Sequence, residues 1–262
     1  MRSRVLSAPA RAGGDRVAED RVKGFPLRRL VRDISSVLMI SGLLLVLDAG
    51  LTLVWQEPVT AVIGLYQRSQ IDKRYLSFQT APLTTVERHA LVTLPGLKQR
   101  IAYLALREQH AVATGDAIGH ISIPRIGAGY DVVQGTDEAS LQKGPGHYPD
   151  TVLPGLGQTV AIAGHRTTYL APFRHLDALK PGDRIVLEMP YAVFTYAVQY
   201  RRIVLPTALW VTHNVGYERL VLSACNPLYS AAQRIIIFAR LKSVVPLGPA
   251  RPARPARVAR AA

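Results

Sequence analysis

The chain has a single cysteine, Cys225, and its surroundings suit covalent catalysis. The thiol follows the apolar run of residues 220–224 and precedes Asn226 and Pro227, so a strand is expected to end at this point. A nucleophile at a strand end is held rigidly and is still exposed. A buried structural cysteine is the alternative interpretation, because free cysteine is among the most buried residue types.

A nucleophilic thiol needs a stabilised thiolate and a proton donor, which is usually a histidine. Of the seven histidines, His165 repeats the placement of Cys225, because it follows the apolar run of residues 159–163 and a glycine and then opens a polar loop. His147 and His120 are the competing candidates. We therefore expect His165 to be the partner of the thiol.

Arg234 is the candidate for stabilising the oxyanion that forms during acyl transfer. It opens the apolar run of residues 235–238, shortly after Cys225. If the strands on either side of residues 226–233 pair antiparallel, Arg234 and Cys225 come to the same end of the sheet. The alternative is an ordinary arginine that begins a strand and faces solvent.

These three residues lie in a region that is typical of an all-β domain. From residue 118 onward, short apolar runs rich in Val, Ile and Tyr alternate with clusters of Gly, Pro and Asp. About seven strands with few helical stretches indicate a β-sandwich or a β-barrel. We predict strands over residues 118–123, 130–133, 159–163, 184–188, 191–205, 219–224 and 234–241.

The N-terminal part of the chain predicts a membrane anchor. Residues 34–55 are apolar except for Asp48, and as a helix they are about 33 Å long, enough to cross a bilayer. A cleaved signal peptide would have a shorter apolar region and a small-residue cleavage site. Residues 1–33 are rich in Lys and Arg, which predicts a cytoplasmic N-terminus with the rest of the chain outside.

Three segments are expected after the membrane. Residues 56–111 have apolar side chains at helical spacing, interrupted by Pro and Gly, and predict a juxtamembrane helical stalk. Residues 112–242 are expected to form the catalytic domain. Residues 243–262 repeat Pro, Ala and Arg without any acid, which predicts a disordered tail.

Charge and cysteine content exclude several functions. The net charge is +14 at pH 7, but most of the excess lies in the segments that flank the catalytic domain. A nucleic-acid-binding protein concentrates positive charge on its folded body, so no nucleic-acid partner is expected. One cysteine excludes an internal disulfide framework, a Cys-rich zinc site and an iron–sulfur cluster.

Three stretches of the sequence resemble the histidine, cysteine and arginine motifs of the sortase family. The order of the motifs and the short interval between the second and the third match that family, as does Ile121-Ser122-Ile123-Pro124 as an opening strand. The three stretches are Ala163-Gly164-His165-Arg166-Thr167-Thr168, Leu222-Ser223-Ala224-Cys225-Asn226-Pro227 and Gln233-Arg234-Ile235-Ile236.

The resemblance covers about residues 112–242. Within the family, the sequence is most similar to class E, the housekeeping sortases of high-GC Gram-positive bacteria. This similarity is based on the Cys-x-Pro continuation and on the sequence around residues 146–149 and 164–168. The chain departs from the family at Ala224, where sortases typically carry a threonine just before the nucleophile.

The resemblance implies a closed sortase-type β-barrel of about eight strands that carries out transpeptidation without a metal or an organic cofactor. Cys225 would attack the Thr–Gly bond of a Leu-Ala-x-Thr-Gly or Leu-Pro-x-Thr-Gly sorting signal in an exported protein. His165 would protonate the leaving amine, and Arg234 would hold the oxyanion. A cell-wall peptide amine would resolve the thioester. Substrate contacts are expected from Thr167, Tyr169, Ala224 and Tyr229.

Three other functions remain open at this point. A pilus-polymerising sortase would use a lysine side chain as acceptor, but the sequence lacks the lid motif and the second span that are typical of that class. A membrane-anchored cysteine peptidase would use the same Cys–His pair with water as acceptor. A non-catalytic anchored domain would bind wall polymers through the basic tail and would not need Cys225.

Overall fold

The computed structural model describes residues 27–54, 60, 62–66 and 83–251 of the 262-residue chain. It contains two compact units, residues 1–47 and 48–262. The first holds most of helix α1 (Leu27–Val54), in which residues 28–51 are long and apolar enough to cross a membrane. This helix contains most of the predicted span, and Trp55 at the end of that span lies outside the described residues, as do residues 1–26.

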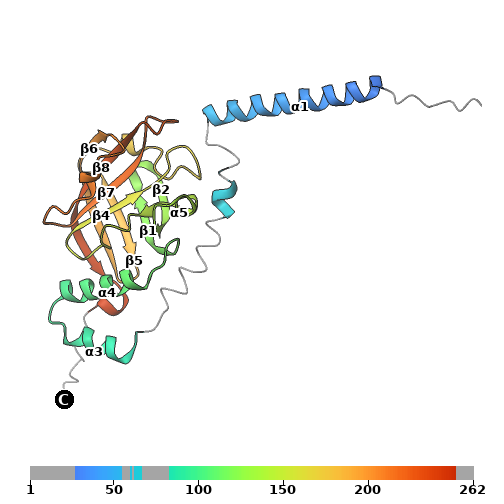
Figure 1. Cartoon of the computed structure of the whole chain (residues 1–262). Coiled ribbons are helices and arrows are strands. Elements are labelled where there is room, and N and C mark those ends of the chain that lie inside the picture. Colours follow the sequence, from blue (N-terminus) through green and yellow to red (C-terminus); the bar gives the residue numbers. More distant parts are fainter. Residues whose placement is uncertain (1–26, 55–59, 61, 67–82, 252–262) are drawn as a thin grey trace, which may run out of the picture. The chain divides into compact units, whose positions relative to one another are not determined.

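Helices α3 (Thr85–Thr93) and α4 (Leu97–Ala111) lie in the predicted stalk. Helix α3 begins with a capping box, in which Thr84 and Glu87 satisfy each other's backbone N–H groups. Buried side chains of both helices join the same core as the barrel, so residues 85–111 pack on the barrel. Figure 1 shows α4 lying across one end of the barrel.

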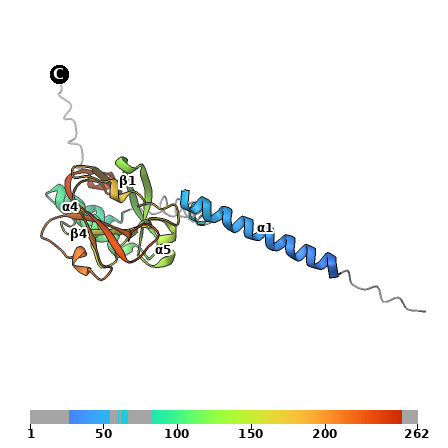
Figure 2. The ribbon, with the colours of Figure 1, turned by 90° about the horizontal axis from the view of Figure 1, so that it is seen from above.

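Eight strands close into a barrel in the order β1-β2-β3-β4-β7-β8-β6-β5 (Figures 1 and 2). The predicted all-β barrel is therefore confirmed. The short helix α5 (Glu138–Lys143) lies between β2 and β3. The strand bounds are β1 Ala117–Ile123, β2 Ala128–Gln134, β3 Gly146–His147, β4 Thr159–Ala163, β5 Arg184–Met189, β6 Ala192–Val204, β7 Arg219–Asn226 and β8 Gln233–Pro246.

Strands β4 and β7 are adjacent and parallel, and both are covered on their two faces. Val160 and Leu222 contribute to the interior core, whereas Val221 packs outside the barrel against Phe238 and Val211 of the β6–β7 connection. Strands buried on both faces read as continuous apolar runs. This explains why residues 159–163 and 219–224 show no alternation of polar and apolar side chains.

The predicted disordered tail starts too early. Strand β8 continues through residues 243–246, where Ser243 pairs with Thr195 and Pro246 pairs with Ala192 of the long strand β6. Ala250, in the 3-10 turn that follows, is fully buried. The prediction of disorder is therefore wrong for residues 243–250, because β6 is long enough to pair with the whole of β8. Residues 252–262 lie outside the described residues.

Candidate active site

Parallel pairing brings Cys225 and His165 to the same rim of the barrel. Ala163 of β4 is in register with Ser223 of β7, and Gly164 continues the pairing by donating its N–H to the Ser223 carbonyl at 3.0 Å. His165 and Cys225 each lie two residues beyond the registered pair. Because parallel strands run in the same direction, both side chains emerge at the same edge.

The glycine before His165 is required by close packing. A Cβ atom at Gly164 would lie 2.5 Å from the ring of Phe173, which is fully buried. The Phe173 N–H in turn donates to the His165 carbonyl at 3.0 Å. The backbone that carries the imidazole is therefore fixed against a core aromatic side chain.

Arg234 lies directly opposite Cys225 in the antiparallel pairing of β7 and β8. Directly opposed residues have their side chains on the same face of the sheet. The Nη1 group of Arg234 donates to the carbonyls of Ala231 at 2.9 Å and Gln233 at 3.0 Å. Its Nε and Nη2 groups make no hydrogen bond to any residue that the structure describes.

A cavity of about 320 Å³ opens beside the thiol. Two of the four residues predicted to contact substrate, Thr167 and Tyr229, lie in its wall. Tyr229 has a left-handed backbone, with φ of 65°, and its hydroxyl accepts a hydrogen bond from Arg174 at 3.2 Å. The cavity is lined by Arg166, Thr167, Cys225, Tyr229, Ser230 and Ala231.

The other two predicted substrate contacts lie elsewhere. The Tyr169 ring packs against the His165 imidazole, with 5.2 Å between ring centroids, in a turn where residues 169–171 all have positive φ. Ala224 is 3% exposed and belongs to the core inside the barrel, on the opposite face of β7 from Cys225. The structure thus places Tyr169 beside the imidazole and keeps the Ala224 side chain away from the cavity.

The His165 imidazole is partly shielded from water by the surrounding side chains. Burial lowers the pKa of His165 from its usual value, and the Glu138 carboxylate of α5 opposes that shift. The Nε2 atom is buried and has no hydrogen-bond partner among the described residues. A buried nitrogen without a partner is unusual in a native structure, and a reacting thiol or amine would satisfy it.

The two competing histidines have structural partners away from Cys225. His147 is buried and contacts the Gln134 side chain at 2.9 Å and the Val152 carbonyl at 3.1 Å. Burial lowers the pKa of His147 to about 4. His120 pairs with Asp131 at 2.7 Å on the β1–β2 ladder.

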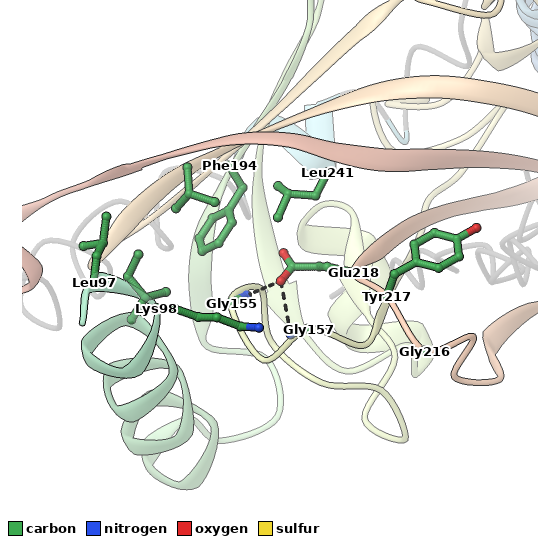
Figure 3. Close-up of a pocket in the computed structure, with 11 residues that line it drawn as sticks. Leu97, Lys98, Gly155, Gly157, Phe194, Gly216, Tyr217, Glu218 and Leu241 are labelled. Atoms are coloured by element: carbon green, nitrogen blue, oxygen red, sulfur yellow. Dashed lines mark hydrogen bonds between the residues drawn. The ribbon is translucent and has the colours of Figure 1, made fainter. Parts of the chain in front are cut away.

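A larger cavity, of about 570 Å³, lies at the opposite end of β7 (Figure 3). Its one carboxylate, Glu218, accepts the N–H groups of Gly155 at 3.1 Å and Gly157 at 3.2 Å and the Tyr196 hydroxyl at 2.8 Å. Glu218 thereby ties the loop that leads into β4 to the start of β7. The residues that line this cavity include no cysteine, whereas the smaller cavity contains Cys225 in its wall and is the candidate active site.

A closed barrel with Cys225, His165 and Arg234 at one rim is the arrangement expected of a sortase, and comparisons with known proteins give the same class. The Sortase domain model matches residues 121–242. Sortase D of Bacillus subtilis is 35% identical over 131 residues, which cover 48% of this chain and 65% of that protein. Sortase SrtE1 of Streptomyces coelicolor is 26% identical over 143 residues, covering 48% of this chain and 41% of that protein.

The solved structure of the SrtF sortase from Corynebacterium diphtheriae is 26% identical with a TM-score of 0.50, over 53% of this chain and 90% of that one. Residues 121–242 of this chain therefore form a domain of the sortase family. The aligned part spans less than two thirds of the length of either curated relative.

Proposed function

We propose that this protein is a membrane-anchored cysteine transpeptidase that cleaves a C-terminal sorting signal and joins the new carboxyl end to an amine of a cell-wall peptide. The observation that carries the proposal is the direct pairing of Cys225 with Arg234, with His165 at the end of the neighbouring parallel strand. Nucleophile, proton donor and oxyanion donor are the three groups that acyl transfer requires.

The reaction has two acyl transfers. The Cys225 thiolate attacks the carbonyl carbon of the Thr–Gly bond, and the free Arg234 donors hold the oxyanion. The intermediate collapses as the C–N bond breaks and protonated His165 gives its proton to the leaving amine. In the second step an amine attacks the thioester, the C–S bond breaks, and His165 takes up the proton that the amine loses.

The proposed signal is of the Leu-Ala-x-Thr-Gly or the Leu-Pro-x-Thr-Gly type. The class E resemblance favours alanine at the second position, and SrtE1 is among the relatives. The higher identity to a sortase D means that both peptides belong in the test.

The decisive experiment uses the full chain in nanodiscs with each peptide, with and without triglycine as the amine. We expect mass spectrometry to find an acyl adduct on Cys225 and a ligated product when triglycine is present. Release of free acid alone, at the same rate with and without triglycine, would instead indicate the peptidase. No adduct with either peptide would contradict the proposal.

The proposed topology has its own test. Arg28, Arg29 and Arg32 crowd the N-terminal side of the apolar helix, so the barrel should lie outside the membrane. Protease added to intact protoplasts should digest residues 83–251, whereas a cytoplasmic marker protein stays intact. Complete protection of the barrel would reverse the assigned orientation.

Replacing Arg234 with lysine should cripple turnover without unfolding the barrel. Lysine keeps the charge but lacks the planar fork of donors that can bind the loop carbonyls and a substrate oxygen together. Losing one oxyanion donor lowers the rate by about 10² to 10³-fold. Steady-state kinetics should show this loss in kcat, and near-normal activity would remove Arg234 from the site.

A further inference from the structure

Arg166, the residue after His165, has a buried guanidinium beside the nucleophile. The side chain is 4% exposed and its head lies in the wall of the Cys225 cavity. Nε and Nη2 both donate to the Arg174 carbonyl at 3.2 Å, and Nη2 also donates to Asp177 Oδ1 at 2.9 Å. Nη1 donates to the Cys225 carbonyl at 3.4 Å and to Asn226 Oδ1 at 3.1 Å.

These contacts use the whole donor capacity of the side chain. A guanidinium has five N–H groups, and Arg166 makes five hydrogen bonds. It therefore has no donor left for a substrate, although it lines the cavity. Arg234 differs in this respect, because its Nε and Nη2 groups are free of hydrogen bonds to the described residues.

The five bonds join three parts of the chain, two of them 8 to 11 residues apart and the third 59 to 60 residues away. One is the loop after β4, which carries His165; the second is the segment of residues 174–177; the third is the end of β7, which carries Cys225. The ion pair with Asp177 compensates the buried charge. Among the residues that the structure describes, the Arg166 side chain is thus a direct polar link between the histidine loop and the backbone of the nucleophile.

We propose that Arg166 is a positioning residue that holds the Cys225 backbone at a fixed place relative to the His165 imidazole. It acts through the Cys225 carbonyl and the Asn226 side chain, and not by touching substrate. The inference rests on the proposed function only in that the Cys–His pair is the reacting pair. A displacement of about 1 Å between reacting groups can lower a rate by 10²-fold, so a rigid link of this kind has a large effect on turnover.

The test uses iodoacetamide alkylation of Cys225 in the full chain, measured against pH. The chain has one cysteine, so the reaction reports on one thiol, and it needs no sorting peptide. We expect the alkylation rate of the wild-type protein to change over the pH range in which His165 gains or loses its proton. His165→Ala should remove this limb of the pH profile. We expect Arg166→Lys, which offers three donors in the wrong geometry, to remove the same limb.

The double variant separates positioning from a general loss of structure. If Arg166 acts through the Cys–His geometry, Arg166→Lys causes no further change in the His165→Ala background, because the two residues act as a unit. If the two effects multiply, the proposal is wrong. With a sorting peptide, kcat should fall by about 10²-fold while KM changes little, because no substrate contact is lost.

Two further variants complete the design. Arg202→Lys is the matched control, because Arg202 is exposed, stacks over Tyr200 and Trp210 and is not among the residues that line the cavity. It should leave the alkylation profile unchanged. If Arg166→Lys does not fold, Asn226→Ala serves in its place, because it removes the side-chain acceptor of Arg166 at a half-buried site. It should change the pH profile of alkylation in the same direction as expected for Arg166→Lys. A wild-type profile in a folded Arg166→Lys protein, or in Asn226→Ala, overturns the proposal.

Discussion

Replacing Cys225 with alanine should abolish both cleavage and ligation of a sorting-signal peptide while the barrel stays folded. The expected loss is about 10⁶-fold, down to the background rate, because the residue that forms the covalent intermediate is removed. Cys225 is half-buried at the rim of the barrel, so truncating its side chain leaves no large cavity in the core. Peptide turnover and the melting temperature, measured on the same preparation, check both parts of the expectation.

The controls for this variant follow from the geometry. Ser243→Ala makes a change of similar size on the exposed part of β8 and should leave turnover intact. His165→Ala should be nearly as inactive as Cys225→Ala, and combining the two should cost little more, because the pair acts as a unit. Residual ligation by Cys225→Ala would show that another residue is the nucleophile.

Much of the barrel could be predicted from the sequence, for a physical reason. Strands such as β4 and β7 are buried on two faces, and their apolar runs end in Gly or Pro, which makes both the strand and its end visible. Strand β3 has two residues, too few for any periodic pattern. The end of β8 could not be predicted from local sequence, because its pairing depends on the length of β6, which is remote in sequence.

The candidate site divides in the same way. The placement of Cys225 and His165 follows from strand ends, and that of Arg234 follows from a hairpin, so local patterns predict that the three residues lie at one rim of the barrel. The role of Arg166 was not predictable, because its acceptors at Cys225 and Asn226 lie 59 and 60 residues away. The resemblance predicts a substrate contact at Ala224 from the threonine that sortases typically carry at this position, whereas strand alternation directs the Ala224 side chain into the core.

Burial of a charged side chain was also not predictable, and Glu108 of α4 is the clearest example. A glutamate on an amphipathic helix is expected to face solvent, but Glu108 is 3% exposed, and its Oε1 has no hydrogen-bond partner among the described residues. Burial raises the pKa of Glu108 from 4.5 to about 8, and Arg107 opposes the shift only in part. The folded protein therefore holds this carboxyl group in its neutral form at pH 7.

The raised pKa of Glu108 determines whether the free energy of unfolding rises or falls with pH. Below pH 4.5 the group is protonated in both states and costs nothing. Between pH 4.5 and about 8 the unfolded chain releases the proton and the folded chain keeps it, so stability falls as the pH rises. At about 1.4 kcal/mol per pKa unit, the loss is on the order of 3–5 kcal/mol by pH 8.

Glu108→Gln should therefore stabilise the protein at pH 8 and have little effect at pH 5. Glutamine mimics the neutral acid at nearly the same volume and does not ionise, so the pH-dependent penalty disappears. For a domain of this size, a gain of 3–5 kcal/mol corresponds to a rise of about 10 °C in Tm. Thermal unfolding of the full chain in nanodiscs at both pH values measures it, with the exposed Glu138→Gln as the matched control.

The slope that remains in the variant identifies the other buried acid. Burial also raises the pKa of Glu218, although its three hydrogen bonds oppose the shift. Glu218 should therefore leave a smaller fall in stability with the same sign. If Glu108→Gln shows the full wild-type dependence on pH, Glu108 is ionised in the folded protein, and α4 must then move far enough to give its carboxylate water. If the dependence shrinks but does not vanish, both acids contribute, and the size of the decrease measures the share of Glu108.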